Sequence, residues 1–350
     1  MNNIKIGMLG AAAIGNWGIV QPCRKVGGIE LYAVAARNKD RANSYAKKYA
    51  IPVVHTCYED LLADPMIDAI YNPLPNSLHC EWTIKALDAG KHVLCEKPFA
   101  SNAQEARQMQ LAAQKNNRVL MEAFHYRFHP MAQRMQDAVK LLGKIRHIET
   151  NMCVPLKNKA DIRYDYSLAG GSTMDVGAYT LHLLRSLAIA SLTDGASENA
   201  DDLLPQVTSA KATLLNDVID RAMKASFVWP NGMTGSIHCS LWSMSLLNLS
   251  AHVYGENGEL HVINPYLPHL WNRFKLKLNG KTVKERIKGD STYTYQLRSF
   301  LQRIENGPTY ANDLSDAIAN MRLIDSIYEK AGLPLRGCES QSAFAYQYQN

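Results

Sequence analysis

The first third of the chain alternates short apolar runs with stretches that carry the 3.6-residue apolar spacing of helices. Short apolar runs that are bounded by glycine, proline or polar residues predict buried strands. The predicted strands are Ile4–Leu9, Leu31–Ala36, Val53–His55, Asp68–Tyr71, His92–Cys95 and Val119–Ala123. Because these strands alternate with helices, the pattern predicts an α/β domain built on a doubly wound parallel sheet.

The helices expected between these strands have recognisable ends. The first follows a glycine turn and extends to about Val26, and another runs from Ser101, paired with Gln104 as a capping box, to about Lys115. The others are Lys39–Tyr49, Tyr58–Ala63 and His79–Ala89. Gly90 suits the position that closes the last of these helices.

The pattern changes after Phe124. An aromatic and basic segment, 125–130, leads into a helix that ends at Gly143. Strands then follow with few intervening helices: Ile145–Val154, Val207–Leu214, Met223–Val228, Thr234–Leu241, Leu247–Tyr254 and Glu259–Ile263. Such a run predicts a mostly antiparallel sheet in a second, α+β domain. Two helices, about Tyr293–Glu305 and Asp313–Lys330, precede a short tail.

Chain length supports this division. A chain of 350 residues exceeds the size at which one core stops growing, so we expect two domains, 1–124 and 125–350, with the last helix able to pack back on the first. An apolar content of 47% and a charged content of 20% are typical of soluble globular proteins. The 38 basic and 32 acidic residues are spread along the chain, which predicts neither a nucleic-acid nor a membrane partner.

Cysteine usage predicts a reducing, cytoplasmic compartment. The seven cysteines are an odd number, and they form neither a C-x-x-C pair nor a spacing typical of a metal site, so no metal is expected. They are Cys23, Cys57, Cys80, Cys95, Cys153, Cys239 and Cys338. No uninterrupted apolar run approaches the roughly 18 residues of a membrane span.

The first predicted strand enters a glycine turn, 10–15, with the sequence Gly-Ala-Ala-Ala-Ile-Gly. The dinucleotide fingerprint G-x-G-x-x-G uses its second glycine for close approach to pyrophosphate, and Ala12 stands there in this chain. Taken alone, the turn is equally explained by small residues that pack a helix on a strand. Its position favours a Rossmann domain, because the next strand ends some twenty residues later, where the fingerprint expects a residue that contacts the ribose.

That residue is Arg37. An acidic residue would accept hydrogen bonds from the 2′-hydroxyl of NAD, whereas a guanidinium pairs with the 2′-phosphate of NADP. Asn38 and Arg41 lie nearby in sequence, and together they favour NADP over NAD. The alternative is a solvated charge cluster at the start of a helix.

Two further segments follow strands and therefore lie at the same carboxyl edge, where ligands of open α/β sheets bind. The segment 72–76 contains two prolines and suits the nicotinamide side of the cofactor. The segment after His92–Cys95 reads Glu96-Lys97-Pro98, and Lys97 is the first candidate for a reacting residue. Glu96 is either a cofactor contact or a structural partner for backbone amides, and His79 either caps its helix or touches the ligand.

A second group of candidates follows Gly170 and Gly171. Asp175, Tyr179 and His182 are spaced i, i+4 and i+7, so they share one face of a predicted helix and can point into one cleft. The alternative for the tyrosine and the histidine is that they pack in the core, with the polar end of each side chain hydrogen-bonded.

These motifs together resemble the glucose-fructose oxidoreductase and inositol dehydrogenase (Gfo/Idh/MocA) family. The resemblance rests on Glu96-Lys97-Pro98 and on the segment from the paired glycines to Tyr179, and it extends to the segments 254–260 and 320–325. The segments 74–79, 121–130 and 174–179 are most similar to the dihydrodiol dehydrogenase and D-xylose dehydrogenase (NADP) branch, whose variant of the fingerprint resembles Gly10-Ala11-Ala12.

The resemblance implies a Rossmann domain followed by an open-faced sheet, which the family often uses for dimerisation. It implies NADP as cofactor, a cis peptide bond before Pro98, and a substrate held between the two domains. The cofactor contacts expected are Gly10, Ala11, Ala12, Ile14, Gly15, Arg37, Asn38, Arg41, Pro73, Leu74, Asn76, His79, Glu96 and Lys97. The substrate contacts expected are Lys97, Tyr126, Arg163, Asp175 and Tyr179.

Hydride transfer at a carbinol carbon also moves a hydroxyl proton, so the site needs an acid/base and a charge that stabilises the developing alkoxide. Lys97 supplies the charge, Asp175 orients it or the substrate, and Tyr179 carries the proton, with His182 as the second candidate. The expected activity is hydride transfer between NADP(H) and a secondary alcohol or carbonyl of a sugar, polyol or cyclic diol. The alternatives are a nicotinamide-dependent glycosidase and a non-catalytic NADP-binding sensor or scaffold.

Overall fold

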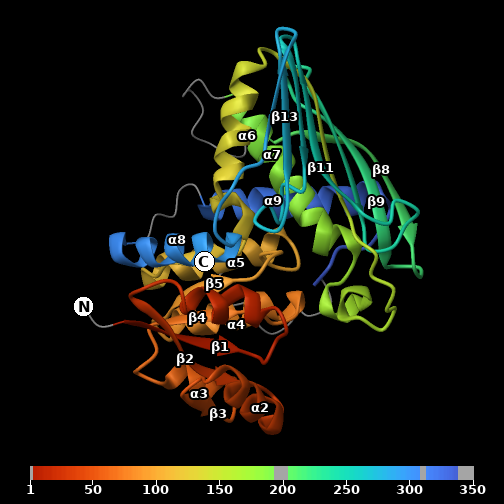
Figure 1. Cartoon of the computed structure of the whole chain (residues 1–350). Helices are drawn as coiled ribbons and strands as arrows, with labels where there is room; N and C mark the ends of the chain where they lie inside the picture. Colours follow the sequence, from red (N-terminus) through yellow and green to blue (C-terminus); the bar gives the residue numbers. More distant parts are fainter. Residues whose placement is uncertain (1–2, 193–203, 308–312, 338–350) are drawn as a thin grey trace. The chain divides into compact units, whose positions relative to one another are not determined.

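The computed structural model describes residues 3–192, 204–307 and 313–337 (Figure 1). Contacts between residues divide it into two compact units. The first unit takes in the described residues up to His125 together with Tyr293–Ala317, and the second takes in Tyr126–Thr292 and the described residues from Ile318 to Gly337. The domain limits expected from the sequence, 1–124 and 125–350, stay a prediction.

The first unit contains the predicted parallel sheet, which is confirmed. Its six strands lie in the order β3-β2-β1-β4-β5-β6, and every neighbouring pair is parallel. They are β1 (Ile4–Leu9), β2 (Ile29–Ala35), β3 (Val53–His55), β4 (Ala69–Asn72), β5 (His92–Cys95) and β6 (Leu120–Glu122). Between β1 and β4 the strand order reverses, which is where doubly wound sheets bind their ligands.

The described helices of the first unit include α2 (Lys39–Tyr49), α3 (Tyr58–Ala63), α4 (His79–Asp88), α5 (Ala103–Asn116) and nearly all of α8 (Thr292–Asn306). α2 packs against β2 and β3, and α4 packs against β4, β5 and α5. The capping box of α5 lies one residue later than predicted. Asn102 accepts from the Glu105 amide at 2.9 Å, while Glu105 Oε2 accepts from the Ser101 amide at 2.9 Å.

The helix after the glycine turn is shorter than the sequence predicts. It consists of a π-helical turn, η1 (Asn16–Val20), and a short α1 (Gln21–Cys23). At Gly18 this helix lies close to the sheet, and a Cβ at this position would clash with the Tyr71 hydroxyl. A larger residue at position 18 would therefore require the buried Tyr71 side chain to move.

The second unit contains an eight-stranded sheet in the order β14-β13-β12-β11-β7-β10-β9-β8. Its strands are β7 (Ile145–Cys153), β8 (Gln206–Leu214), β9 (Asp220–Val228), β10 (Thr234–Ser240), β11 (Asn248–Gly255), β12 (Gly258–Ile263), β13 (Arg273–Leu278) and β14 (Lys281–Glu285). Among the described strands of this sheet only β7 and β10 pair in parallel, so the prediction of a mostly antiparallel sheet is confirmed.

The hairpin of β13 and β14 was not predicted. Its turn residues Asn279 and Gly280 both have positive φ, at 48° and 78°, as two-residue hairpin turns require. Lysines dominate this edge hairpin, and charges of this kind protect an exposed edge strand from pairing with other chains.

Helices cover one face of the second sheet. They are α6 (Pro130–Leu141), α7 (Ala178–Leu192) and the part of α9 (Asp313–Lys330) from Ile318 onward. α7 packs against β7 and β10, and α6 packs against α7 and β12, so the two helices lie along the sheet (Figure 1). The opposite face carries polar side chains such as His147, Glu149 and Asn151 of β7.

Within the described residues no helix is both long enough and apolar enough to cross a membrane. The six cysteines that lie in the described part of the chain are free thiols, and Cys338 lies outside it.

Candidate active site

The turn after β1 has the backbone of a dinucleotide-binding loop. Gly10 has φ +80°, a conformation that favours glycine, and its amide donates to the Ala35 carbonyl at 2.7 Å. In the described part of the chain, the amides of residues 11–14 donate to no acceptor. Amides left open at a strand-to-helix turn suit an anionic pyrophosphate, so this loop fits a dinucleotide although Ala12 replaces the second glycine of the fingerprint.

Gly15 serves packing rather than phosphate approach. A Cβ there would lie 2.6 Å from Tyr45 Oη and 2.8 Å from Met8 Sδ. Gly18, one helical turn further on, packs against Tyr71 in the same way, and it was not among the predicted residues. The spacing of the two glycines on one helix face was the signal available for it.

Two arginines lie beside this loop. Asn38 caps α2 by accepting from the Arg41 amide at 2.8 Å, and Arg41 Nη2 donates to the Ala11 carbonyl at 2.9 Å. Arg41 thus connects α2 to the glycine turn through this hydrogen bond. Arg37 is exposed directly after β2, and its side chain forms no hydrogen bond or ion pair with the described residues.

His79 connects the two other loops of the same sheet edge. Its Nδ1 lies 2.8 Å from the Pro98 carbonyl oxygen, and its Nε2 lies 2.8 Å from that of Leu74. Burial lowers the pKa of His79 to about 4, so the neutral ring donates to one carbonyl at a time. The side chain does not cap α4 and instead fixes the 72–76 segment against Pro98.

Glu96-Lys97-Pro98 follows β5 at the carboxyl edge, and the Lys97–Pro98 peptide bond is cis, as the resemblance implied. Glu96 is buried. Its Oε1 accepts from Tyr71 Oη at 2.7 Å, and its Oε2 accepts from the Lys97 amide at 3.3 Å. Burial, together with this carboxylate, raises the pKa of Tyr71 well above its ordinary value. Glu96 therefore has the structural partners that the sequence allowed for, while Lys97 is half-buried.

In the second unit the predicted helix begins as a π-helical turn, η6 (Thr173–Gly177), and continues as α7. Around this transition three backbone carbonyls accept hydrogen bonds from side chains, as is common where a helix departs from regular α-helical bonding. Thr180 Oγ1 donates to Gly177 O at 2.8 Å, Asn320 Nδ2 to Ala178 O at 3.2 Å, and Thr150 Oγ1 to Thr180 O at 2.9 Å. Side chains from β7 and α9 thus support the irregular turn that carries Asp175.

Asp175 forms an ion pair with Arg163, whose Nε lies 3.0 Å from the carboxylate Oδ2. Asp175 is the main cause of the raised pKa of Arg163. Asp161 contacts the same guanidinium at 3.1 Å, so Arg163 is held between two carboxylates.

His182 and Tyr179 lie in an aromatic cluster with Tyr126 and Tyr266. Tyr126 Oη lies 2.5 Å from His182 Nδ1, and both side chains are buried. The ring centroid of Tyr179 lies 6.0 Å from that of Tyr126 and 5.9 Å from that of Tyr266. The second unit therefore brings Tyr126, Tyr179 and His182 together and pairs Arg163 with Asp175, whereas the predicted cofactor contacts line the carboxyl edge of the first unit.

Among the described residues no group of three or more histidine, cysteine, aspartate or glutamate side chains is arranged to hold a metal ion.

Family models match both parts of the chain. The model described as an oxidoreductase family with an NAD-binding Rossmann fold matches residues 4–124, and the model of the GFO/IDH/MocA C-terminal domain matches residues 132–261. The protein belongs to the Gfo/Idh/MocA oxidoreductase family.

Relatives of this Gfo/Idh/MocA protein include both activities of the branch that its motifs resemble. It is 33% identical to D-xylose 1-dehydrogenase (NADP(+)) 2 of Haloferax volcanii over 331 residues, which cover 93% of this chain and 96% of the relative. It is 31% identical to the trans-1,2-dihydrobenzene-1,2-diol dehydrogenase of Sus scrofa over 238 residues, 67% of each chain. The resemblance stated from the sequence is confirmed.

Solved structures share the fold. The 3-ketoreductase KijD10 from Actinomadura kijaniata, in complex with NADP and TDP-benzene, superposes with a TM-score of 0.84 at 23% identity, covering 94% of this chain and 98% of that one. The aldose-aldose oxidoreductase from Caulobacter crescentus superposes with a TM-score of 0.83 at 22% identity, covering 95% and 98%.

Proposed function

We propose that the protein transfers hydride between NADP(H) and a secondary alcohol or carbonyl of a sugar, polyol or cyclic diol. The observation that carries this proposal is Lys97, which lies just past the carboxyl end of β5 in a chain that matches an NADP-dependent sugar dehydrogenase along nearly its whole length. The family supplies the reaction class, and the residues below supply the chemistry.

The first unit holds the cofactor. The open amides of residues 11–14 would receive the pyrophosphate, and the exposed guanidinium of Arg37 would pair with the 2′-phosphate that distinguishes NADP from NAD. The 72–76 segment, fixed by His79, would hold the nicotinamide side of the cofactor. NADPH would supply the hydride.

We assign the chemistry on the substrate to Lys97, Tyr179 and Asp175. The Lys97 ammonium stabilises negative charge on the substrate oxygen, and Tyr179 gives or takes the hydroxyl proton. Asp175, with its carboxylate oriented by Arg163, holds a neighbouring hydroxyl of the substrate. Tyr126 orients His182, which remains the second candidate for the proton transfer.

A substrate panel tests this function. The purified protein is incubated with NADP⁺ and, separately, with aldoses, polyols and cyclic trans-diols, while NADPH absorbance is recorded. We expect turnover with at least one of these classes at a rate on the order of 1–10³ s⁻¹. Hydrolysis of a chromogenic glycoside without net NADPH formation would assign the protein to the glycosidases instead. Tight NADP binding without any turnover would make it a sensor or scaffold.

Replacing Arg37 with aspartate is expected to reverse the cofactor preference. The change removes a charge-assisted contact to the 2′-phosphate and places a carboxylate beside it, so the ratio of NADPH to NADH affinity should fall by about 10–100-fold. Fluorescence titration with both cofactors measures the ratio. Lys47→Asp, an equal charge change on an exposed residue at the other end of α2, is the matched control and should leave the ratio unchanged. An unaltered ratio in Arg37→Asp refutes this role.

We also propose a homodimer that forms through the face of the second sheet opposite α6 and α7. The support for it is a row of half-buried polar side chains on that face, including His147, His252 and Ser250. Ser250→Arg adds bulk and charge at the centre of the face and should shift the protein to monomers in sedimentation velocity. Ser44→Arg, on exposed α2, should not. A Ser250→Arg dimer as stable as the wild type would exclude this interface.

The free cysteines support a reducing compartment, and we propose the cytoplasm.

A further inference from the structure

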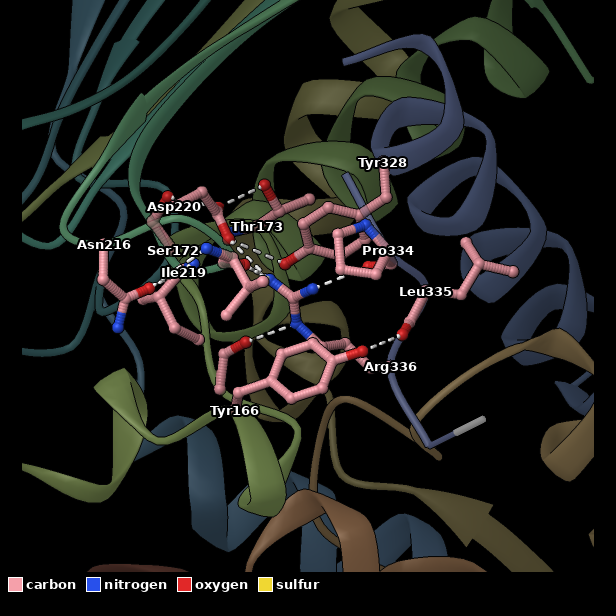
Figure 2. A network of polar contacts seen from close by, with 12 residues as sticks. Tyr166, Ser172, Thr173, Asn216, Ile219, Asp220, Tyr328, Pro334, Leu335 and Arg336 are labelled. Atoms are coloured by element: carbon pink, nitrogen blue, oxygen red, sulfur yellow. Dashed lines mark hydrogen bonds and ion pairs between the residues drawn. The ribbon is translucent and has the colours of Figure 1, made fainter. Parts of the chain in front are cut away.

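A fully buried ion pair lies in the second unit, outside the residues assigned to chemistry above. Asp220, at the start of β9, and Arg336, in the segment after α9, both have side chains that are 0% exposed, and Arg336 Nη2 lies 3.2 Å from Asp220 Oδ1 (Figure 2). Burying two charges is costly, and a buried pair is by itself weak evidence for stability. The other contacts of the pair indicate what it does.

Asp220 accepts five hydrogen bonds, three of them from the start of η6. Its Oδ2 accepts from Ser172 Oγ, from the Thr173 amide and from Thr173 Oγ1, each at 2.7 Å. Its Oδ1 accepts from Tyr328 Oη at 2.9 Å as well as from Arg336. Figure 2 shows the Asp220 carboxylate with Ser172, Thr173, Tyr328 and Arg336 gathered around it. The carboxylate thus joins the first residues of η6 to the C-terminal segment.

Arg336 uses its whole guanidinium. Nε donates to Gly170 O at 2.8 Å, Nη1 to Pro334 O at 2.7 Å, and Nη2 to Val218 O at 3.0 Å in addition to Asp220. The rings of Tyr166 and Tyr328 lie on the guanidinium, at 4.9 Å and 4.1 Å from Cζ. A lysine has no planar fork with which to reproduce these contacts.

The network also fixes the path of the chain before η6. Gly171 has φ +131°, and a Cβ there would lie 2.6 Å from Tyr328 Oη and closer still to Asp220 Oδ1. Its amide donates to the Arg163 carbonyl at 2.8 Å, while its own carbonyl accepts from the Asp175 amide at 3.1 Å. The backbone of Gly171 is therefore bonded to both members of the Arg163–Asp175 ion pair.

We propose that Asp220 and Arg336 are positioning residues of the active site. They hold the 170–173 segment so that η6 begins at a defined place and orientation. Asp175, within η6, and Tyr179, at the start of α7, then face the substrate in fixed positions. This inference rests on the proposed function, because it assigns a consequence for catalysis to contacts that lie away from the reacting atoms. Small displacements of substrate-positioning groups lower rates by up to about 100-fold.

The test compares Arg336→Met, Arg336→Lys and Tyr328→Phe with the wild type. Turnover and KM are measured on the folded fraction, NADPH affinity by fluorescence, and amide hydrogen exchange peptide by peptide. In Arg336→Met we expect kcat/KM to fall by about 10–100-fold, NADPH affinity to stay within about twofold, and exchange to rise over residues 170–179. Arg336→Lys, which keeps the charge but loses the fork, should recover little of the lost rate.

Tyr328→Phe removes one hydroxyl at nearly constant side-chain volume. It is a milder change to the same network, and it provides the test if Arg336→Met does not fold. It should lower kcat/KM by about threefold to tenfold, with the same local rise in exchange. Arg134→Met is the matched control, because Arg134 bonds Glu285 and covers Phe274 elsewhere in the same unit. It should lower stability but leave kcat/KM within about twofold.

Unchanged kcat and unchanged exchange at 170–179 in both Arg336→Met and Tyr328→Phe would overturn the positioning role. A uniform rise in exchange across the second unit, with activity proportional to the folded fraction, would show a purely structural pair and would overturn it too. Failure of the proposed function looks different, because the wild type itself would then show no turnover while the exchange comparison still reports on the network.

Discussion

Replacing Lys97 with methionine is expected to lower kcat/KM by about 10³-fold while NADPH still binds. Methionine keeps most of the apolar stem and removes the ammonium, so the oxygen of the substrate loses the charge that stabilises its developing negative charge. Removing one such stabilising group costs about 10²–10³-fold in enzymes that rely on it. Initial rates on the best substrate of the panel, with NADPH fluorescence titration, measure both quantities.

Lys91→Met is the matched control for this variant. Lys91 precedes β5 at the opposite end of the strand, where its Nζ donates to the carbonyls of Asp64 at 2.8 Å and Ile67 at 2.7 Å. Losing these bonds should lower the free energy of unfolding by about 1–3 kcal/mol and leave kcat on the folded protein unchanged. Wild-type turnover in Lys97→Met would remove Lys97 from the mechanism.

Replacing Tyr179 with phenylalanine is expected to have the second largest effect, a fall of about 10²–10³-fold in kcat. The ring packing against Tyr126 and Tyr266 is retained, so the loss reports the hydroxyl that carries the proton. Steady-state rates on the best substrate, with the wild type in parallel, measure this loss.

Tyr266→Phe removes a hydroxyl from the same cluster and should retain kcat within about twofold, because this hydroxyl is fully buried. His182→Asn separates the two candidates for the proton. It should lower kcat less than Tyr179→Phe, since His182 bonds Tyr126 at 2.5 Å and acts through that pair. A near-normal Tyr179→Phe together with an inactive His182→Asn would assign the proton to the histidine.

The sequence predicted the first sheet well because parallel strands are buried on both faces and read as continuous apolar runs. The same patterns located the carboxyl edge, and hence the loops that carry Arg37 and Lys97. The hairpin of β13 and β14 was missed although Asn279-Gly280 is a strong turn pair. Its strands alternate lysines with a few apolar residues, Phe274 among them, and this weak period was passed over.

Other features depend on contacts between distant residues, which a single sequence does not contain. The π-helical η6 begins where the Thr173 amide donates to Asp220, and the residues of the segment 173–177 do not themselves predict a π-helical turn. Gly18 is required only because Tyr71 lies against it. The capping box of α5 is displaced by one residue because the Asn102 side chain accepts from the Glu105 amide.

In the candidate site, too, local patterns were predicted and contacts between distant residues were not. Helical spacing selected Asp175, Tyr179 and His182 as residues that share a face, and residue type suggested their roles. It did not reveal that Asp175 pairs with Arg163, or that Tyr126 bonds His182 across 56 positions of the chain. Arg336 was passed over as part of a short tail, because burial of a lone arginine has no signature in sequence.

The transfer of deuterium tests the central claim most directly. The protein is incubated with NADPH deuterated at nicotinamide C4 on the transferred face and with the carbonyl form of the best substrate, and the product is analysed by mass spectrometry and NMR. We predict deuterium on the new carbinol carbon, in an amount that matches the NADP⁺ formed. In Lys97→Met the rate of deuterium transfer should fall by the same factor as its turnover. Product formed without deuterium from either face of the cofactor would contradict hydride transfer as the function of this protein.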